Sequence, residues 1–173
     1  MSESLPEFRF YPDPVSDGTL ERATAVCGAC ERARGWIATS LLYAADVPED
    51  ARFCPWCIAD GSAAARFNEI EAGAAPALAA IVERRTPGFV TWQDWAWVVH
   101  CGEPAVYLGQ PRAGEFRQYP DACDDLRAQT SVHDWPPGQV EELIDALDPE
   151  ASVTGYLFRC DVCGAHLARW DAD

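Results

Sequence analysis

The stretch FCPWCIADGSAAARF, from Phe53 to Phe67, places two cysteines around a Pro-Trp pair at the start of a predicted helix. A thioredoxin-like redox centre has a Cys-x-x-Cys pair at a helix N-terminus. One half of a structural zinc site has the same arrangement. The redox centre also requires a buried strand that leads into the motif, whereas the polar segment 46–52 precedes Phe53 here.

A second cysteine pair favours the zinc interpretation. Cys27 and Cys30 form another Cys-x-x-Cys turn, and 23 residues separate Cys30 from Cys54. Zinc takes four thiolates in a tetrahedron, and two such turns joined by a hairpin-sized insert supply them. We therefore predict a site of Cys27, Cys30, Cys54 and Cys57, held in a treble-clef-like lobe over residues 25–68. A closed four-cysteine site leaves no position for water, so this zinc is expected to be structural.

A third pair, Cys160 and Cys163, is followed by Gly164 and resembles a zinc-ribbon knuckle. It would need two more ligands, and we favour Cys101 and His100, which lie at a strand end before a turn. The alternatives remain open at this point: an unmetallated thiol turn, or ligands from elsewhere in the chain, for which the candidates are Cys123, His133 and His166.

Charge and composition argue against a nucleic-acid-binding, membrane-spanning or secreted protein. The 173 residues are 49% hydrophobic, and 13 basic residues against 28 acidic ones give a net charge of −15. Such a surface repels phosphate backbones, so nucleic-acid binding is disfavoured. The acidity either serves solubility alone or favours a protein partner that is basic. No apolar run is long enough to span a membrane, and the N-terminus MSESLPEFRF has no secretory signal. We expect a cytoplasmic protein whose eight cysteines are mostly reduced.

The pattern of elements predicts an α+β fold, because helices and strands mix without a regular βαβ alternation. We expect a single domain over 1–173, with the zinc lobe at 25–68 and a remainder at 86–173 that contains a mixed or antiparallel sheet and a C-terminal knuckle hairpin. The expected strands are 5–14, 35–44, two strands around the turn Gly102–Pro104, and one on each side of the last knuckle. The expected helices cover 58–71, 76–84, 121–129 and the segment from Pro136, which Asp134 would cap.

Several motifs make the chain resemble the CbrC family of bacterial proteins. They are CPWCIADGSAA from Cys54, RTPGFVTWQ from Arg85, HCGEPA from His100, GYLFRCDVCG from Gly155 and the opening LPEFRFYPDP from Leu5. The resemblance spans Leu5 to Asp171, although Tyr11 stands where many members have histidine. It implies the three cysteine pairs but no catalytic activity. The family's namesake is linked to tolerance of a nuclease colicin.

Two functions from different classes follow from these observations. The leading hypothesis is a non-catalytic zinc protein that acts through protein contacts, in toxin tolerance or stress. The alternative is an enzyme, either a thiol-disulfide redox protein using Cys160 and Cys163 or a metal-dependent enzyme using a second zinc with His100.

Overall fold

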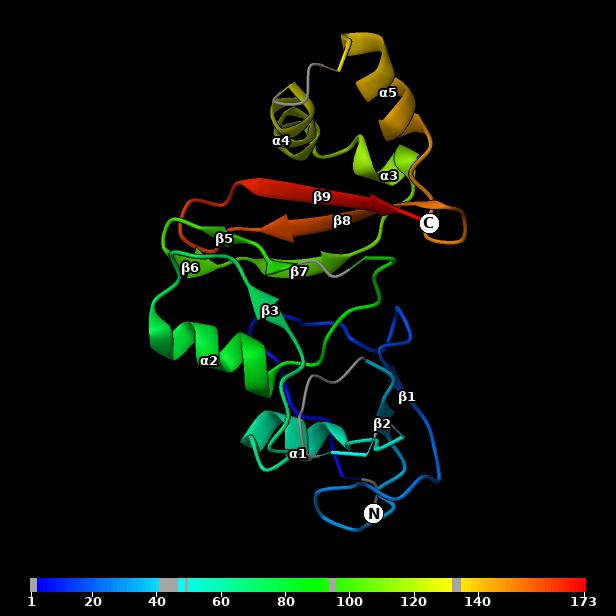
Figure 1. Ribbon diagram of the computed structural model, residues 1–173, viewed down its shortest axis with the longest axis vertical. Coiled ribbons are helices and arrows are strands. Elements are labelled where there is room, and N and C mark those ends of the chain that lie inside the picture. Colours follow the sequence, from blue (N-terminus) through cyan, green and yellow to red (C-terminus); the bar gives the residue numbers. More distant parts are fainter. Residues whose placement is uncertain (1–2, 41–46, 49, 94–95, 132–134) are drawn as a thin grey trace.

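A three-stranded antiparallel sheet, in the order β7-β8-β9, divides the molecule into two layers of helices and loops (Figure 1). The computed structural model describes residues 3–40, 47–48, 50–93, 96–131 and 135–173. The sheet strands are β7 (Val106–Gly109), β8 (Val153–Arg159) and β9 (His166–Ala172). Helices α3 (Ala113–Phe116), α4 (Pro120–Ser131) and α5 (Pro137–Asp145) lie on one side of the sheet, whereas α1 (Pro55–Asp60) and α2 (Pro76–Arg85) lie on the other.

Alternation along β8 sends side chains into two separate cores. Tyr156 and Phe158 point to the first core, which the N-terminal two-thirds of the chain builds against the sheet. Leu157, between them, points to the second core with Leu126 of α4 and Ile144 of α5. The first core contains Cys27, Cys54, Cys57 and Cys160, and the second contains no residue of a Cys-x-x-Cys pair.

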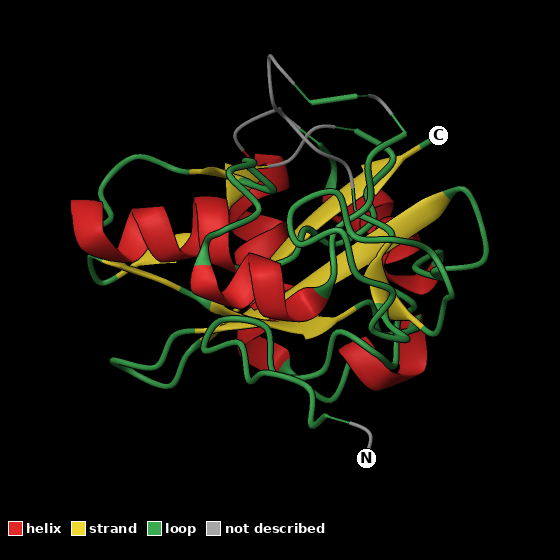
Figure 2. Ribbon diagram, turned by 90° about the horizontal axis from the view of Figure 1, so that it is seen from below, coloured by secondary structure: helices red, strands yellow, loops and turns green. Residues whose placement is uncertain are grey.

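The N-terminal half is held by short strand pairs and many loops, as Figure 2 shows from below. Strand pairing is antiparallel for β1 with β2, parallel for β3 with β4, and antiparallel for β5 with β6. These strands are β1 (Leu20–Glu21), β2 (Ile37–Ala38), β3 (Glu69–Ile70), β4 (Ala96–Trp97), β5 (Val99–His100) and β6 (Glu103–Pro104).

The α+β class is confirmed, and so are the elements with the clearest patterns. The helix expected at 76–84 is α2, with Pro76 at its first turn, and the hairpin around the last knuckle is β8–β9. The helices expected at 121–129 and from Pro136 are α4 and α5. The N-cap of α5 is Pro136, and Asp134 lies outside the described residues.

The helix expected over 58–71 is wrong, because α1 ends at Asp60. Gly61 follows it in the left-handed conformation, at φ 81°, and its backbone N–H donates to the carbonyl of Ile58. A glycine in this position terminates a helix, since other residues adopt that conformation at a cost. The alanine-rich residues after Gly61 therefore form turns that lead to β3.

Two strand expectations are also wrong in their extent. Residues 5–14 form no strand, although Phe8, Phe10 and Tyr11 are buried and the backbone N–H of Tyr107 donates to the Phe10 carbonyl. The strand expected at 35–44 is limited to Ile37–Ala38 among the described residues, with 41–44 outside them. The turn expected at Gly102–Pro104 begins one residue earlier, at Cys101, because Glu103 and Pro104 belong to β6.

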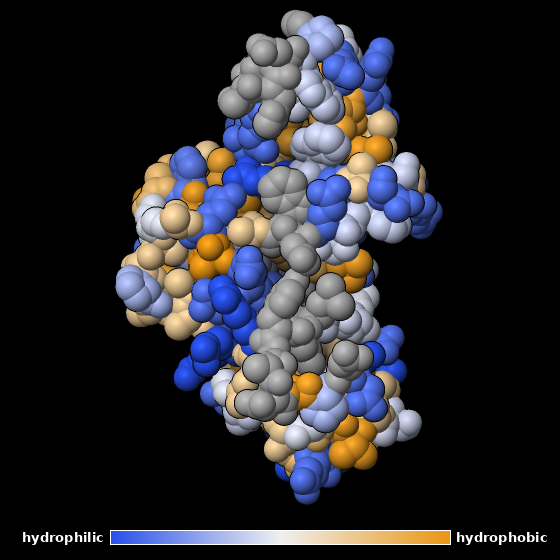
Figure 3. All heavy atoms as spheres, in the orientation of Figure 1, coloured by the Kyte–Doolittle hydropathy of each residue, from blue (hydrophilic) through white to orange (hydrophobic). Residues whose placement is uncertain are grey.

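The surface mixes hydrophilic and hydrophobic residues on the face that Figure 3 shows. Within the described residues, no helix is both long enough and apolar enough to cross a lipid bilayer.

Candidate metal centres

The first cysteine group, which we call site 1, consists of Cys27, Cys30, Cys54 and Cys57. Cys27 and Cys30 lie in a tight turn, where the N–H of Glu31 donates to the carbonyl of Cys27 at 2.8 Å. Glu31 has a φ of 55°, which turns the chain back toward β2. Cys54 is the N-cap of α1, and Cys57 lies in its first turn. The turn and the helix start thus face each other across the site.

The sulfur atoms of site 1 are close enough to share one metal ion. All four lie within 4.8 Å of one another, and the Cys30 and Cys54 sulfurs are 3.9 Å apart. A zinc–sulfur bond of about 2.3 Å implies sulfurs about 3.8 Å apart in a tetrahedron. A disulfide needs about 2.05 Å between sulfurs, and all eight cysteines are free thiols here. The geometry therefore fits a metal ion and excludes a cystine.

The surroundings of site 1 split the acidities of its thiols. Burial opposes ionisation of Cys27, but backbone N–H groups of Cys54, Cys30 and Ala29 outweigh it and lower the pKa of Cys27 to about 7. The Cys54 N–H donates to the Cys27 sulfur at 3.3 Å. Burial, together with the neighbouring thiols, raises the pKa of Cys57 to about 12. Four adjacent thiols cannot all ionise without a cation among them, and a bound metal ion supplies that charge.

Arg34 provides the one basic side chain seen at site 1 among the described residues. Its Nη1 atom lies 3.9 Å from the Cys54 sulfur, and its guanidinium lies 4.1 Å above the Trp56 ring. Glu3 forms an ion pair with the other nitrogen of the same group. A cation beside a tetrathiolate offsets part of its negative charge. The sequence offered no motif for this contact, because Arg34 precedes Cys54 by 20 residues.

The second group, which we call site 2, is formed where two hairpin turns meet at one end of the sheet (Figure 1). The β5–β6 turn carries His100 and Cys101, and the β8–β9 turn carries Cys160 and Cys163. Cys101 has a φ of 51° and Gly102 one of 79°, which tighten the first turn. In the second turn the N–H of Gly164 donates to the Cys160 carbonyl at 2.8 Å.

Distances in site 2 also fit a single ion. The four ligand atoms lie within 4.8 Å of one another. The Nδ1 atom of His100 is 3.3 Å from the Cys101 sulfur and 3.5 Å from the Cys163 sulfur. Tetrahedral zinc with nitrogen and sulfur ligands places such atoms about 3.6 Å apart. Of the partners considered for Cys160 and Cys163, the structure thus brings His100 and Cys101 to them.

The two sites differ in their exposure to solvent. Three of the four ligands of site 1 are buried, whereas Cys101 and Cys163 of site 2 are exposed. A contact with the Cys163 thiol raises the pKa of Cys101 to about 11. The pKa of Cys163 is lowered, chiefly by the backbone N–H of Ala165. Site 2 is therefore the more accessible of the two.

The remaining candidates lie elsewhere. Cys123 is buried in the second core, with its sulfur 3.8 Å from the Phe116 carbonyl. His166 has its Nδ1 atom 3.1 Å from a carboxylate oxygen of Asp121. His133 lies outside the described residues.

Comparison with known proteins gives whole-chain matches. The model of the uncharacterised protein family UPF0167 matches residues 5–172. A UPF0167 protein of Mycobacterium bovis is 42% identical over 98% of this chain and 94% of its own length. A UPF0167 protein of Pseudomonas aeruginosa is 33% identical over 100% of this chain and 99% of its own length. No solved structure matches the chain.

These matches correct the expected family. The motifs around Cys54, Arg85, His100 and Gly155 suggested the CbrC family, but the family model and the relatives carry the UPF0167 name. The matches give no support to the colicin tolerance that the CbrC resemblance implied.

Proposed function

This chain belongs to the UPF0167 family, and we propose that it is a non-catalytic binding protein whose fold is held by two zinc ions. Its activity lies in contacts between its acidic surface and a cationic protein partner. Eight free thiols and metal held by thiolates suit a reducing compartment, so we place the protein in the cytoplasm.

One observation carries the proposal: two groups of four ligand atoms, each within 4.8 Å, built only from cysteine and histidine. Zinc accepts both ligand types in a tetrahedron, whereas carboxylates and carbonyls would suit magnesium or calcium. Four protein ligands fill the coordination sphere and leave no position for a substrate or an activated water. The ions would therefore hold segments together rather than react.

The connectivity supports a treble-clef-like arrangement at site 1 and a ribbon-like one at site 2. Site 1 joins a knuckle to the start of α1, and β2 lies between them in sequence. Site 2 joins two hairpin turns, one of them at the end of the longest hairpin, β8–β9. In each case the metal would connect segments that lie far apart in the sequence.

Charge supports a cationic partner. The net charge is −15, and a zinc ion bound by three or four thiolates leaves further negative charge at its site. Complementary charge accelerates association and makes it sensitive to salt. Partners captured on the immobilised protein should therefore dissociate as salt is raised, and capture that is insensitive to salt would contradict this part of the proposal.

Metal stoichiometry tests the core of the proposal. Native mass spectrometry with elemental analysis should give two zinc ions per chain. Cys54→Ser should lose the ion of site 1, and Cys163→Ser that of site 2. Cys123→Ser is the matched control, because its thiol is buried away from both groups, and it should retain both ions. Iron in place of zinc, or one ion or none in the parent protein, would overturn the proposal.

A second candidate function rests on the exposure of site 2. Cys101 and Cys163 are exposed and lie beside His100, so a thiol-disulfide enzyme or a metal-dependent enzyme using this site is the alternative. Rapid reversible oxidation of Cys160 and Cys163 in a zinc-free protein that remains folded would favour it. Slow oxidation limited by zinc release would favour the structural role.

A further inference from the structure

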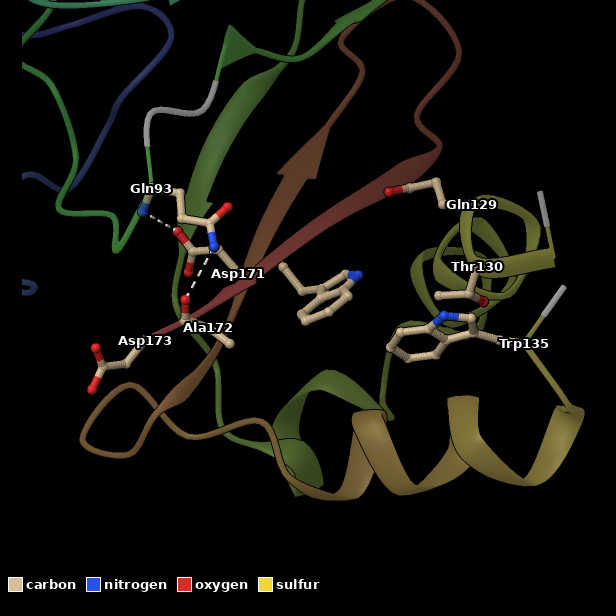
Figure 4. A pocket seen from close by; sticks show the side chains of 8 residues that line it. Gln93, Gln129, Thr130, Trp135, Asp171, Ala172 and Asp173 are labelled. Atoms are coloured by element: carbon tan, nitrogen blue, oxygen red, sulfur yellow. Dashed lines mark hydrogen bonds between the residues drawn. The ribbon is translucent and has the colours of Figure 1, made fainter. Parts of the chain in front are cut away.

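A pocket of about 330 Å³ lies at the C-terminal end of β9 (Figure 4), and no residue of site 1 or site 2 lines it. Two tryptophans border it: Trp170, from the strand, and Trp135, which precedes α5. Gln93, Gln129, Asp171 and Asp173 line the rest of it together with small residues. A volume near 300 Å³ is at the lower end of the range for ligand pockets.

The two indoles present aromatic surface to the pocket. Their ring centroids are 5.6 Å apart, and the ring planes are tilted by 55°. Both side chains are only partly buried and pack against the second core, which fixes their positions. Figure 4 shows the labelled Trp135 ring beside Thr130, between the strand and α5. Aromatic faces carry partial negative charge and attract cations.

Several polar groups of the pocket offer acceptor oxygens. The side-chain amide of Gln93 donates to the Ala172 carbonyl at 3.2 Å, and that of Gln129 donates to the Ala168 carbonyl at 3.0 Å. Each amide nitrogen is thus directed at the strand, which leaves the amide oxygen as an acceptor. Asp173 adds an exposed carboxylate, and none of the described lining residues is basic.

Asp171 shapes the pocket from within the fold. Its carboxylate is buried and accepts hydrogen bonds from the backbone N–H groups of Trp92 and Gln93 and from the Tyr156 hydroxyl. These contacts fasten the segment that carries Gln93 to the end of β9. The carboxylate charge remains close to the pocket, where neighbouring low-dielectric surface screens it less than water would.

From this combination we propose that the pocket binds the guanidinium group of an arginine side chain on a basic protein partner. The proposal rests on the cationic partner of the proposed function and names the place where it docks. A guanidinium is planar and stacks on indole faces, and its five N–H donors match several acceptor oxygens at once. An ammonium offers a compact charge without the flat surface.

The experiment uses the full-length protein labelled with 5-fluorotryptophan and followed by fluorine NMR. The probes are a blocked Gly-Arg-Gly peptide and its citrulline counterpart, which keeps the shape but lacks the charge. We expect the arginine peptide to shift the Trp135 and Trp170 resonances, which Trp→Phe variants assign. The citrulline peptide should bind about tenfold more weakly, because the cation–π attraction is lost.

Variants locate the site. Trp170→Leu should weaken arginine binding by about tenfold, and Asp173→Asn by severalfold with a reduced dependence on salt. Trp36→Leu and Asp161→Asn are the matched controls, because these residues lie outside the pocket, and both should bind like the parent protein. If Trp170→Leu fails to fold, Trp135→Leu and Asp173→Asn still test the site.

The possible results test the pocket assignment and the metal proposal independently. Equal binding of the citrulline peptide, shifts confined to other tryptophans, or no shift at all would overturn the pocket assignment. If the same sample contained two zinc ions, the proposed structural role of the metals would stand. A sample without zinc that still bound arginine through Trp170 would overturn the metal proposal and support the pocket. If free alkylammonium ions bound as tightly as the arginine peptide, the pocket would recognise cations in general, and the assignment to a guanidinium would be overturned.

Discussion

At the scale of single residues, Arg34 places a positive charge beside the candidate metal centre of site 1, although it lies outside every cysteine motif. It contacts the Cys54 sulfur, the Trp56 ring and Glu3, and so joins site 1 to the N-terminal segment. Its guanidinium is fixed by this stacking and ion pairing. The Arg34 side chain is therefore already ordered beside the cysteines, so metal binding would cost little of its conformational entropy.

Arg34→Gln should weaken metal retention at site 1. The change removes the cation that offsets the thiolate charge, and we expect transfer of this ion to a competing chelator to become severalfold easier. Chelator competition followed by native mass spectrometry measures it. Arg52→Gln is the control, because Arg52 is exposed and its side chain donates only to the neighbouring Ala51 carbonyl among the described residues. Equal losses in the two variants would contradict an effect specific to Arg34.

Asp17 and Asp121 should give opposite responses to pH. Burial raises the pKa of Asp17 despite its hydrogen bonds with Tyr11 and Thr19. The folded state then binds more protons than the unfolded one, so the Asp17 contribution to stability falls as pH rises above 3.8 through the raised pKa. Asparagine does not ionise, so the Asp17→Asn variant avoids this loss of stability. The difference in melting temperature, variant minus parent, should therefore increase as the pH rises above 3.8.

Asp121 is the control with the other sign. Burial opposes its ionisation, but the backbone and side chain of His166 outweigh it and lower the pKa of Asp121 below 3.8. Its stabilising contribution is therefore complete above pH 3.8 and is lost only as pH falls through the lowered pKa. Asp121→Asn should therefore lower the melting temperature above pH 3.8, and this deficit should shrink as the pH falls through the lowered pKa. Calorimetry at fixed zinc tests both variants, and parallel pH curves for the two would contradict the assignment.

At the scale of elements, α4 protects the exposed edge of β9. Asp121 and Asp125 accept from the backbone N–H groups of His166 and Ala168, and Gln129 donates to the Ala168 carbonyl. The three side chains recur every four residues and so share one face of the helix. An unprotected edge strand can pair with another chain, and this helix covers part of it.

Gly155 of β8 lies close against Leu147 of the second core. A methyl group at this position would lie 2.9 Å from a Leu147 methyl carbon. Gly155→Ala should therefore destabilise the protein by about 1–3 kcal/mol through overpacking. Gly138→Ala in α5 is the matched control, since nothing lies within 4 Å of the added carbon.

Chemical denaturation measures both changes. Gly138→Ala should be neutral or stabilise the protein by up to about 1 kcal/mol, because alanine favours a helix. A Gly155→Ala protein as stable as the parent would show that Leu147 moves aside without cost.

At the scale of the whole molecule, the buried ligands of both candidate sites belong to one core and not to the other. Cys27, Cys54, Cys57 and Cys160 lie in the first core, whereas α4 and α5 supply the second with no ligand of either site. The two cores share the sheet, and β8 contributes side chains to both. Loss of metal should therefore destabilise the first core more than the second.

Removal of metal with a strong chelator should raise hydrogen exchange in α1 and around Phe53 more than in α4 and α5. The region around α1 and Phe53 has little regular secondary structure and would lose the ion that joins its segments. The region of α4 and α5 keeps its apolar core. Exchange mass spectrometry before and after chelation measures the difference. A uniform rise over the whole chain would show that the two cores unfold as one unit.

The local chemistry of this protein can be predicted from its amino-acid sequence alone. The cysteine spacing indicated the three Cys-x-x-Cys turns, and the helical periodicity of α2 and α5 was clear enough to place them. Patterns of this kind depend on neighbours a few residues apart, so they can be read directly from the chain. The helix at 58–71 failed because the left-handed conformation of Gly61 outweighed the alanine content that followed it.

Contacts between groups far apart in the sequence, in contrast, depend on how the elements pack in three dimensions. His100 and Cys101 reach Cys160 and Cys163 because the β5–β6 turn lies against the β8–β9 turn, a contact that spans about 60 residues of chain. The same holds for Arg34 beside Cys54 and for Trp135 beside Trp170. Such contacts arise from the packing of whole elements against a common sheet, and no local pattern encodes the register of that packing.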